Sequence, residues 1–216
     1  MKQAQLNKTL NAELRKSAKA HNWNCSGGFV FKATELLFFS IIVVGQVKSR
    51  GLFYSLRYKL LAFDDLFWKI FKMEENSSQP LSFRASGAWT APMATISEGK
   101  YSIEDRVEDS LHSTVNNIID RCEGEAAEVS NEIRGLDDNL DMIEKLYAHL
   151  KNEHPGAVTN IWVERLLTTI LKNEYDRSET IIRDRLDNHD SGGFQVGAKS
   201  FYDLANEYVD RLVMDV

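Results

Sequence analysis

The chain has 216 residues, of which 43% are hydrophobic and 27% charged, and its net charge is −6 at pH 7. This hydrophobic content is enough for a packed core and excludes a wholly disordered chain. The average charge hides an asymmetry: residues 1–72 carry 12 Lys and Arg against 4 Asp and Glu, whereas residues 73–216 carry 14 against 28. The two parts can compensate each other, or the basic part can bind an acidic partner.

Membrane and export signals are not expected. The apolar run over residues 36–44, broken only by Ser40, is far shorter than the ~20 residues of a spanning helix. No N-terminal apolar run resembles a secretion signal. Cys25 and Cys122 lie far apart and form no metal-ligand spacing. We therefore predict a cytoplasmic protein with two ordinary thiols and no membrane association.

The first predicted element is a helix over residues 2–20. Leu6, Leu10, Leu14 and Ala18 recur every fourth residue and form an apolar stripe. Basic residues surround the stripe. Such a helix can bind a membrane surface or nucleic acid, or it can pack its stripe on a neighbouring sheet.

A small, mostly antiparallel sheet is predicted next. Residues 37–48 are apolar on both alternating faces, which is typical of a central strand with cover on both sides. Residues 52–60 alternate and predict a half-buried strand with a basic outer face, and residues 29–34 are expected to pair on the far side of the central strand. Further strands are predicted over residues 81–85 and 88–96.

A short helix is expected between these strands, beginning near Asp64 and Asp65, where negative charge favours a helix N-terminus. A polar linker over residues 74–80 follows it.

After residue 100 the sequence changes to amphipathic, acidic helices. Ser102 and Asp105 resemble a capping box, and Gly124 is expected to end the first helix. The remaining predicted helices cover residues 125–134, 136–150, a segment capped by Thr159, a segment around 181–186, and a last one capped by Ser200 with Asp203; His154-Pro155-Gly156 and a glycine-rich loop at 191–197 interrupt them.

The fold class predicted from this order is α+β. An N-terminal helix and a small antiparallel sheet domain occupy residues 1–100. An acidic, mostly helical region occupies residues 101–216 and is expected to pack on the first domain.

One catalytic pattern survives inspection. Glu35 precedes the central strand, and Gln46 and Lys48 stand at its end. In a broad class of metal-dependent nucleases, an acidic residue and an acidic or glutamine residue hold Mg²⁺ or Mn²⁺, and a lysine stabilises the attacking water or the developing charge. A nuclease-like enzyme acting on DNA is therefore the alternative function, and a polar strand end entering a turn is the structural explanation.

A second group of residues combines arginine with an aromatic side chain. Arg57, Arg84 and Trp89 suit an acidic or planar ligand. They equally suit a solvated sheet face.

The order of features resembles a family of uncharacterised bacterial α+β domains. The matching residues are Gly28-Phe29, Gln46-Val47-Lys48-Ser49 and Phe53-Tyr54-Ser55-Leu56, followed by Ser82-Phe83-Arg84 and Gly87-Ala88-Trp89. The resemblance covers residues 5–100. It implies a helix-plus-sheet fold but no established activity or catalytic residue. Some small bacterial proteins of this style are suspected toxin-immunity or phage-defence partners.

The leading hypothesis is a non-catalytic, cytoplasmic protein-binding module of the immunity type, without metal or cofactor. Acidic helices can meet a basic surface of a protein partner. Asp137, Asp138 and Asp141 are the candidate binding residues on the acidic face, and nucleic acid remains a possible partner of the basic N-terminal part.

Overall fold

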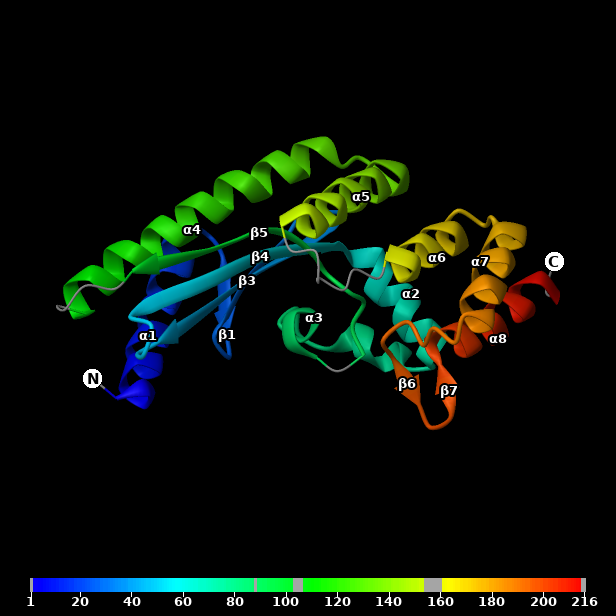
Figure 1. Cartoon of the computed structure of the whole chain (residues 1–216), viewed down its shortest axis with the longest axis horizontal. Helices are drawn as coiled ribbons and strands as arrows, with labels where there is room; N and C mark the ends of the chain where they lie inside the picture. Colours follow the sequence, from blue (N-terminus) through cyan, green and yellow to red (C-terminus); the bar gives the residue numbers. More distant parts are fainter. Residues whose placement is uncertain (1, 88, 103–106, 154–160, 215–216) are drawn as a thin grey trace. The chain divides into compact units, whose positions relative to one another are not determined.

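The computed structural model describes residues 2–87, 89–102, 107–153 and 161–214. The chain forms two compact units. We call residues 1–59, 81–86 and 93–132 the sheet unit, and residues 60–80, 87–92 and 133–216 the helical unit. The α+β class predicted from the sequence is confirmed, because an N-terminal helix and an antiparallel sheet precede a mostly helical region (Figure 1).

The sheet has five strands in the order β1-β2-β3-β4-β5. The strands are β1 (Asn24–Ser26), β2 (Phe29–Ala33), β3 (Leu37–Gln46), β4 (Gly51–Leu60) and β5 (Ala94–Ser102). As predicted, β3 is the central strand. β2 pairs antiparallel with it, with Phe29 opposite Ile42 and Ala33 opposite Phe38.

The alternation predicted for β4 is also observed. Leu52, Tyr54, Leu56 and Tyr58 are buried on one face. The expected basic outer face holds only in part, because Lys59 is buried and its ammonium lies 5.8 Å from the ring centroid of Phe38. A cation over an aromatic face compensates part of the cost of burying that charge.

Two helices cover one face of the sheet. α1 (Gln3–Ala20) contacts β1, β2 and β3, and α4 (Val107–Glu132) contacts β3 and α1. In Figure 1, α4 lies lengthwise along the sheet. The predicted stripe of α1 is confirmed, because Leu6, Leu10, Leu14 and Ala18 are all buried.

The prediction that Gly124 ends the first helix of this region is wrong. α4 continues through Gly124 to Glu132. A glycine inside a helix costs about 1 kcal/mol relative to alanine. The stripe of Ile118, Cys122, Ala126 and Val129 stays buried on both sides of the glycine, and this burial outweighs the cost.

The prediction of a strand at residues 81–85 is wrong. Phe83–Ser86 forms a short helix, α3, which contacts β2. The strand predicted at residues 88–96 begins only at Ala94. The sheet reaches five strands because residues 24–26, for which no strand was predicted, form β1.

The helical unit consists of short helices and one small hairpin. They are α2 (Leu61–Phe71), the 3₁₀ helix η1 (Glu74–Ser78), α5 (Leu136–Glu153), α6 (Ile161–Leu171), α7 (Tyr175–Asp187), β6 (Gln195–Val196), β7 (Lys199–Ser200) and α8 (Phe201–Met214). The buried residues of α5 are Asn139, Met142 and Ile143.

Aromatic side chains from separate segments form one cluster in the helical unit. Phe67 of α2 lies 4.7 Å from both Phe71 and Phe194 and 5.3 Å from Phe201, measured between ring centroids. The ring of Trp89 is tilted against that of Phe71, with 5.1 Å between the ring centroids. Buried aromatic pairs of this kind contribute beyond their buried area.

The predicted cap of the last helix is confirmed. The backbone N–H of Asp203 donates to Ser200 Oγ at 3.2 Å, and the backbone N–H of Ser200 donates to Asp203 Oδ2 at 2.7 Å. This is a reciprocal capping box. The caps predicted at Asp105 and Thr159 and the break at His154-Pro155-Gly156 lie outside the described residues.

None of the helices in the described ranges has the length and apolar character that crossing a membrane requires.

Candidate functional site

The residues of the nuclease hypothesis do not come together. Glu35 lies in the turn before β3, and Gln46 is the last residue of β3. At ~3.3 Å per residue, a strand of this length separates its ends by about 30 Å. Lys48 is exposed in the turn after β3, near Gln46, whose Oε1 accepts a hydrogen bond from Ser49. One metal ion cannot be shared by Glu35 and Gln46.

The acidic candidates do share one surface. Asp137, Asp138 and Asp141 are all exposed in the first turns of α5. Two of them have structural roles: Asp137 accepts a hydrogen bond from Lys172 at 2.8 Å, and Asp138 accepts one from the backbone N–H of Arg134 at 3.0 Å. Carboxylates in this position also stabilise the helix N-terminus.

The arginine and aromatic candidates belong to different units. Arg57 is half-buried on β4, where its Nε donates to Ser55 Oγ at 3.1 Å, and Arg84 lies on α3. Both are in the sheet unit. Trp89 is in the helical unit and belongs to the aromatic cluster.

The sheet unit contains a feature that the sequence analysis did not identify: one end of β3 is unpaired on the β2 side. The pairing of β2 with β3 stops at Phe29 and Ile42, although β3 continues to Gln46. At that point the turn between β1 and β2 lies at Gly27 and Gly28, whose φ values are 60° and 85°. Both φ values lie in the left-handed region, which favours glycine.

Gln3 of α1 occupies part of this open edge. Its Nε2 donates to the carbonyl oxygen of Gly45 at 2.7 Å, and its Oε1 accepts from the backbone N–H of Val47 at 3.1 Å. A side-chain amide that donates to one strand residue and accepts from another imitates a peptide group of a neighbouring strand. The edge can therefore accept peptide-like partners.

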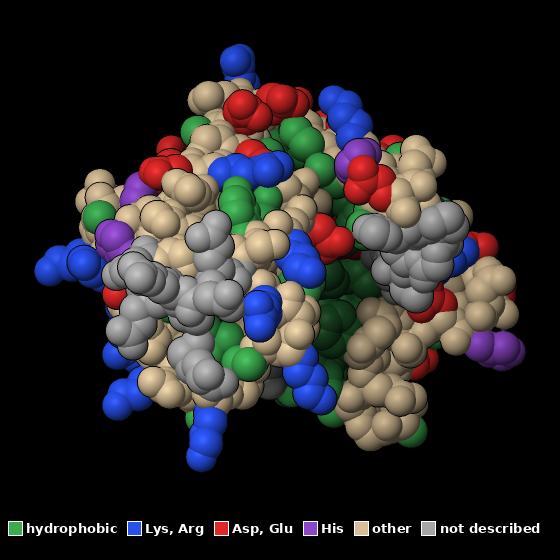
Figure 2. Space-filling model, turned by 60° about the vertical axis from the view of Figure 1, so that its left-hand side comes forward, with side chains coloured by type: hydrophobic (Ala, Val, Ile, Leu, Met, Phe, Trp, Pro, Cys, Tyr) green, Lys and Arg blue, Asp and Glu red, His purple; other side chains and the backbone are tan. Residues whose placement is uncertain are grey.

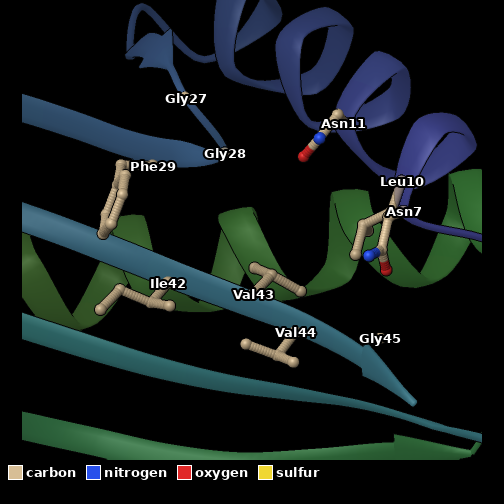
Figure 3. A pocket seen from close by; sticks show the side chains of 10 residues that line it. All are labelled: Asn7, Leu10, Asn11, Gly27, Gly28, Phe29, Ile42, Val43, Val44 and Gly45. Atoms are coloured by element: carbon tan, nitrogen blue, oxygen red, sulfur yellow. The ribbon is translucent and has the colours of Figure 1, made fainter. Parts of the chain in front are cut away.

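A pocket of about 260 Å³ lies beside this position. We call it the edge pocket. Figure 3 shows α1 on one side of it, with Asn11 pointing into the space, and β3 and the glycine turn on the other. The residues lining the edge pocket are Asn7, Leu10, Asn11, Gly27, Gly28, Phe29, Ile42, Val43, Val44 and Gly45.

The backbone of β3 faces the edge pocket at alternate residues. Peptide groups of successive residues point to opposite sides of a strand. Gly45 and Val47 both bind Gln3 on the side of β3 where β2 pairs. Val43 lies two residues before Gly45, so the N–H and C=O groups of Val43 and the N–H group of Gly45 point to this same side. The pocket thus combines backbone donors and an acceptor with the amide side chains of Asn7 and Asn11.

Basic residues of α1 lie next to the helix residues that line the edge pocket. Lys8 and Arg15 are three residues before and four residues after Asn11, positions that are neighbours on a helix surface. Figure 2 turns the α1 end forward and shows separate Lys and Arg side chains projecting from that face. Burial raises the pKa of the Cys25 thiol on β1, and the positive charge of Arg15 partly opposes this, so Arg15 acts on the hairpin side of the pocket too.

A second pocket, of about 310 Å³, lies between α7 and α8 in the helical unit. It is lined by Glu179, Ile182, Arg183, Leu186, Asp187, Asn206 and Asp210. Asn206 donates to Asp210 at 3.0 Å. In the part of the chain that the structure describes, no three His, Cys, Asp or Glu side chains are grouped as metal ligands.

Two carboxyl groups of the described residues are fully buried, those of Asp64 and Glu164. Glu164 on α6 is 1% exposed, and the hydroxyl of Tyr147 on α5 donates to its Oε1 at 2.6 Å. Burial raises the pKa of Glu164 to about 7, against the lowering effect of the Tyr147 hydrogen bond. A carboxyl group held in this way is expected to make the stability of the helical unit depend on pH up to neutrality.

The residues missed by sequence reasoning had a visible signal. Gln3, Asn7 and Asn11 are spaced four apart, and they form an amide stripe beside the apolar stripe of α1. That spacing places them on one helix face, but it does not tell what the face meets.

No family model, no curated protein and no solved structure matches this chain.

Proposed function

We propose that this chain is a non-catalytic protein-binding module that holds its partner at the open end of β3. The observation that carries the proposal is the unpaired edge from Val43 to Gln46, of which Gln3 covers only the part at Gly45 and Val47. An unpaired strand edge is a template for pairing with another chain. Proteins use such edges to recognise extended segments of partners.

The side chains at this edge suit a protein partner. Val44 is 49% exposed at the pocket, and Phe29 and Ile42 beside it are half-buried. Small exposed apolar groups next to backbone donors and acceptors are typical of a recognition site with a polar rim. A partner that inhibits or is inhibited on binding gives the immunity-type role, and a cytoplasmic location remains part of this proposal.

Two other surfaces are weighed against this one. The acidic face at Asp137, Asp138 and Asp141 can meet a basic partner, although Asp137 and Asp138 already stabilise the helical unit. The nuclease alternative, with Mg²⁺ or Mn²⁺ at Glu35 and Gln46, is weakened by their placement at opposite ends of β3.

The test is a comparison of captured partners. Tagged wild-type protein, Val44→Lys and the matched control Val213→Lys are exposed to lysate of the native host at low and moderate salt. Val213 is similarly exposed, at 46%. A lysine on a strand edge opposes pairing. We expect a stoichiometric protein that the wild type and Val213→Lys retain and that Val44→Lys loses.

Two results would contradict the proposal. If all three proteins capture the same partner equally, the edge is not the binding surface, and Asp137→Asn/Asp138→Asn/Asp141→Asn is the next variant to compare. If nucleic acid is recovered without a protein, the basic part of the chain binds DNA or RNA, and cleavage with Mg²⁺ or Mn²⁺ by the wild type and Lys48→Ala then tests the alternative.

A further inference from the structure

We propose that the edge pocket binds a short, acidic, extended peptide segment, which adds to β3 as a strand opposite Val43. The inference rests on the proposed protein-binding function and names what the partner presents. It is carried by the backbone groups of β3, the amide side chains of α1 and the basic residues beside them.

The backbone geometry fixes the first part of the recognition. In an antiparallel ladder, two residues that face each other in a hydrogen-bonded pair exchange two N–H···O bonds. Val43 offers both its N–H and its C=O on the open side, as the direction of the Gly45 and Val47 groups establishes. A peptide residue placed opposite Val43 can therefore form both bonds and continue the ladder beyond β2.

Gln3 defines where the peptide stops. Its amide already occupies the next positions along the edge, at Gly45 and Val47. Its Nε2 also donates to Asn7 Oδ1 at 2.8 Å, so the Gln3 side chain is held in place by two acceptors. The space left between this amide and the glycine turn is about 260 Å³, which is below the usual range for a drug-sized ligand and fits a short chain segment.

Gly28 keeps the mouth of the pocket open. A Cβ atom at this position would lie 3.2 Å from Asn11 Oδ1, so any larger residue would crowd the space between the turn and α1. Asn11 can donate and accept hydrogen bonds. Its amide is therefore placed to bind the peptide backbone or a polar side chain from the side opposite to β3.

Charge selects the side chains of the peptide. Lys8 and Arg15 flank Asn11 on the helix surface. The one acidic residue of α1, Glu13, is bound to His112 at 2.7 Å. A peptide entering the pocket thus meets positive charge from α1. Successive side chains of an extended peptide point to opposite faces. In a peptide that alternates apolar and acidic residues, the apolar side chains can therefore lie on Val44 and Phe29, and the acidic side chains can point toward Lys8 and Arg15.

The experiment measures peptide binding by fluorescence anisotropy. The probes are three short capped peptides: alternating valine and glutamate, alternating valine and lysine, and the valine–glutamate peptide with N-methyl groups on alternate residues. N-methylation removes backbone donors and leaves the charge unchanged. The proteins are the wild type, Asn11→Phe, which fills the pocket, and Ala12→Phe, a control on the exposed neighbouring position. Thermal melting of each variant checks that it is folded.

We expect the valine–glutamate peptide to bind the wild type and Ala12→Phe equally. Its affinity should fall at least about tenfold for Asn11→Phe and on N-methylation, a loss typical of removing a central contact. The valine–lysine peptide should bind weakly. Lys8→Glu/Arg15→Glu should reverse the preference between the two peptides, and added salt should weaken the preferred one.

Three results would overturn the inference. They are equal binding of the glutamate and lysine peptides, equal binding of the N-methylated peptide, and the absence of peptide binding at millimolar concentration. The inference can fail while the proposed function stands: a partner lost by Val44→Lys but retained by Asn11→Phe leaves protein binding at the edge intact and removes the acidic peptide from it.

Discussion

The sheet unit and the helical unit differ in where they hold their polar groups. In the sheet unit, polar side chains meet along the line where α1 packs on α4: Glu13 contacts His112, Ser17 contacts Asn116, and His21 contacts Asp120. Most of these groups reach solvent at the edges of the helices, whereas Ser17, Ser40 and Lys59 of this unit are buried. In the helical unit, Asn139, Glu164, Thr168, Thr169 and Ser178 are at most 3% exposed.

This difference separates two ways of specifying helix packing. A partly solvated polar line costs little when a contact is lost, because water replaces the partner. An enclosed polar group that loses its partner pays the full cost of desolvation. In the helical unit the enclosed Glu164, whose pKa burial raises toward neutrality, is the group whose protonation is expected to change stability. The aromatic cluster of the same unit is expected to contribute through its buried area.

The largest expected effect is on that cluster. Phe67→Ala removes a ring that is fully buried and contacts Phe71, Phe194 and Phe201. We expect it to lower the free energy of unfolding by about 3–5 kcal/mol, the usual range for truncating a core phenylalanine. Urea unfolding gives the magnitude, and hydrogen exchange shows whether protection is lost in the helical unit.

Val213→Ala is the control for this change, since Val213 is 46% exposed and its truncation should alter stability by less than about 0.5 kcal/mol. A loss for Phe67→Ala no larger than that of the control would mean that the cluster does not hold the helical unit together.

The next effect comes from Glu164. Its pKa is raised from 4.5 to about 7 by burial. Between these values the folded state keeps a proton that the unfolded chain has released, so stability falls as the pH rises. The slope is about 1.4 kcal/mol per pH unit and the total about 3 kcal/mol. Glu164→Gln carries no ionisable proton and should lose this slope, which makes it the more stable protein above neutral pH.

Urea midpoints measured across this pH window test the expectation for both proteins. The control is Glu144→Gln, because Glu144 is exposed on α5 and pairs with Arg165 at the surface. Parallel pH profiles for the wild type and Glu164→Gln would show that Glu164 is ionised in the folded protein.

Local patterns were sufficient to predict most elements of both units. The two-sided apolar run identified β3 as central, and the Ser200–Asp203 cap was predicted because its bonds lie within four residues. The failures are short elements fixed from outside. β1 has three residues, too few for a recognisable pattern, and is held by its pairing with β2. α3 has four residues and contacts β2.

The edge pocket was harder to predict than the fold. The spacing of Gln3, Asn7 and Asn11 is present in the sequence. What the stripe faces depends on where β2 stops along β3, and that register joins residues distant in sequence. The turn at Gly27 and Gly28 marks the place, but a glycine pair indicates only a turn. Glu164 was missed because its residue type indicates an exposed position, whereas the packing of α6 buries it together with Val163 and Leu166.

The smallest effect concerns the polar line of the sheet unit. The pKa of His21 is raised, first by its hydrogen bond to the backbone oxygen of Ser17 and then by Asp120 at 2.6 Å. A histidine with a raised folded pKa contributes stability that is present below its unfolded pKa of 6.5 and is lost as the pH rises through the folded value. This window lies at higher pH than that of Glu164, so the two units lose stability in succession as the pH increases.

Asp120→Asn should lower the pKa of His21 without restoring its ordinary value, because the Ser17 oxygen remains. The cost in stability should stay below about 1 kcal/mol, since Asp120 is 62% exposed and surface ion pairs are weak. An NMR titration of the imidazole measures the pKa, with the signal assigned through His21→Gln.

Glu128→Gln is the control, because it removes the same charge from an exposed position on the same helix. If Glu128→Gln lowers the pKa of His21 as much as Asp120→Asn does, the general negative charge of α4 and not the contact with Asp120 acts on the histidine. The pair of His21 and Asp120 would then behave as a solvated surface pair, in contrast to the enclosed carboxyl of Glu164 in the helical unit.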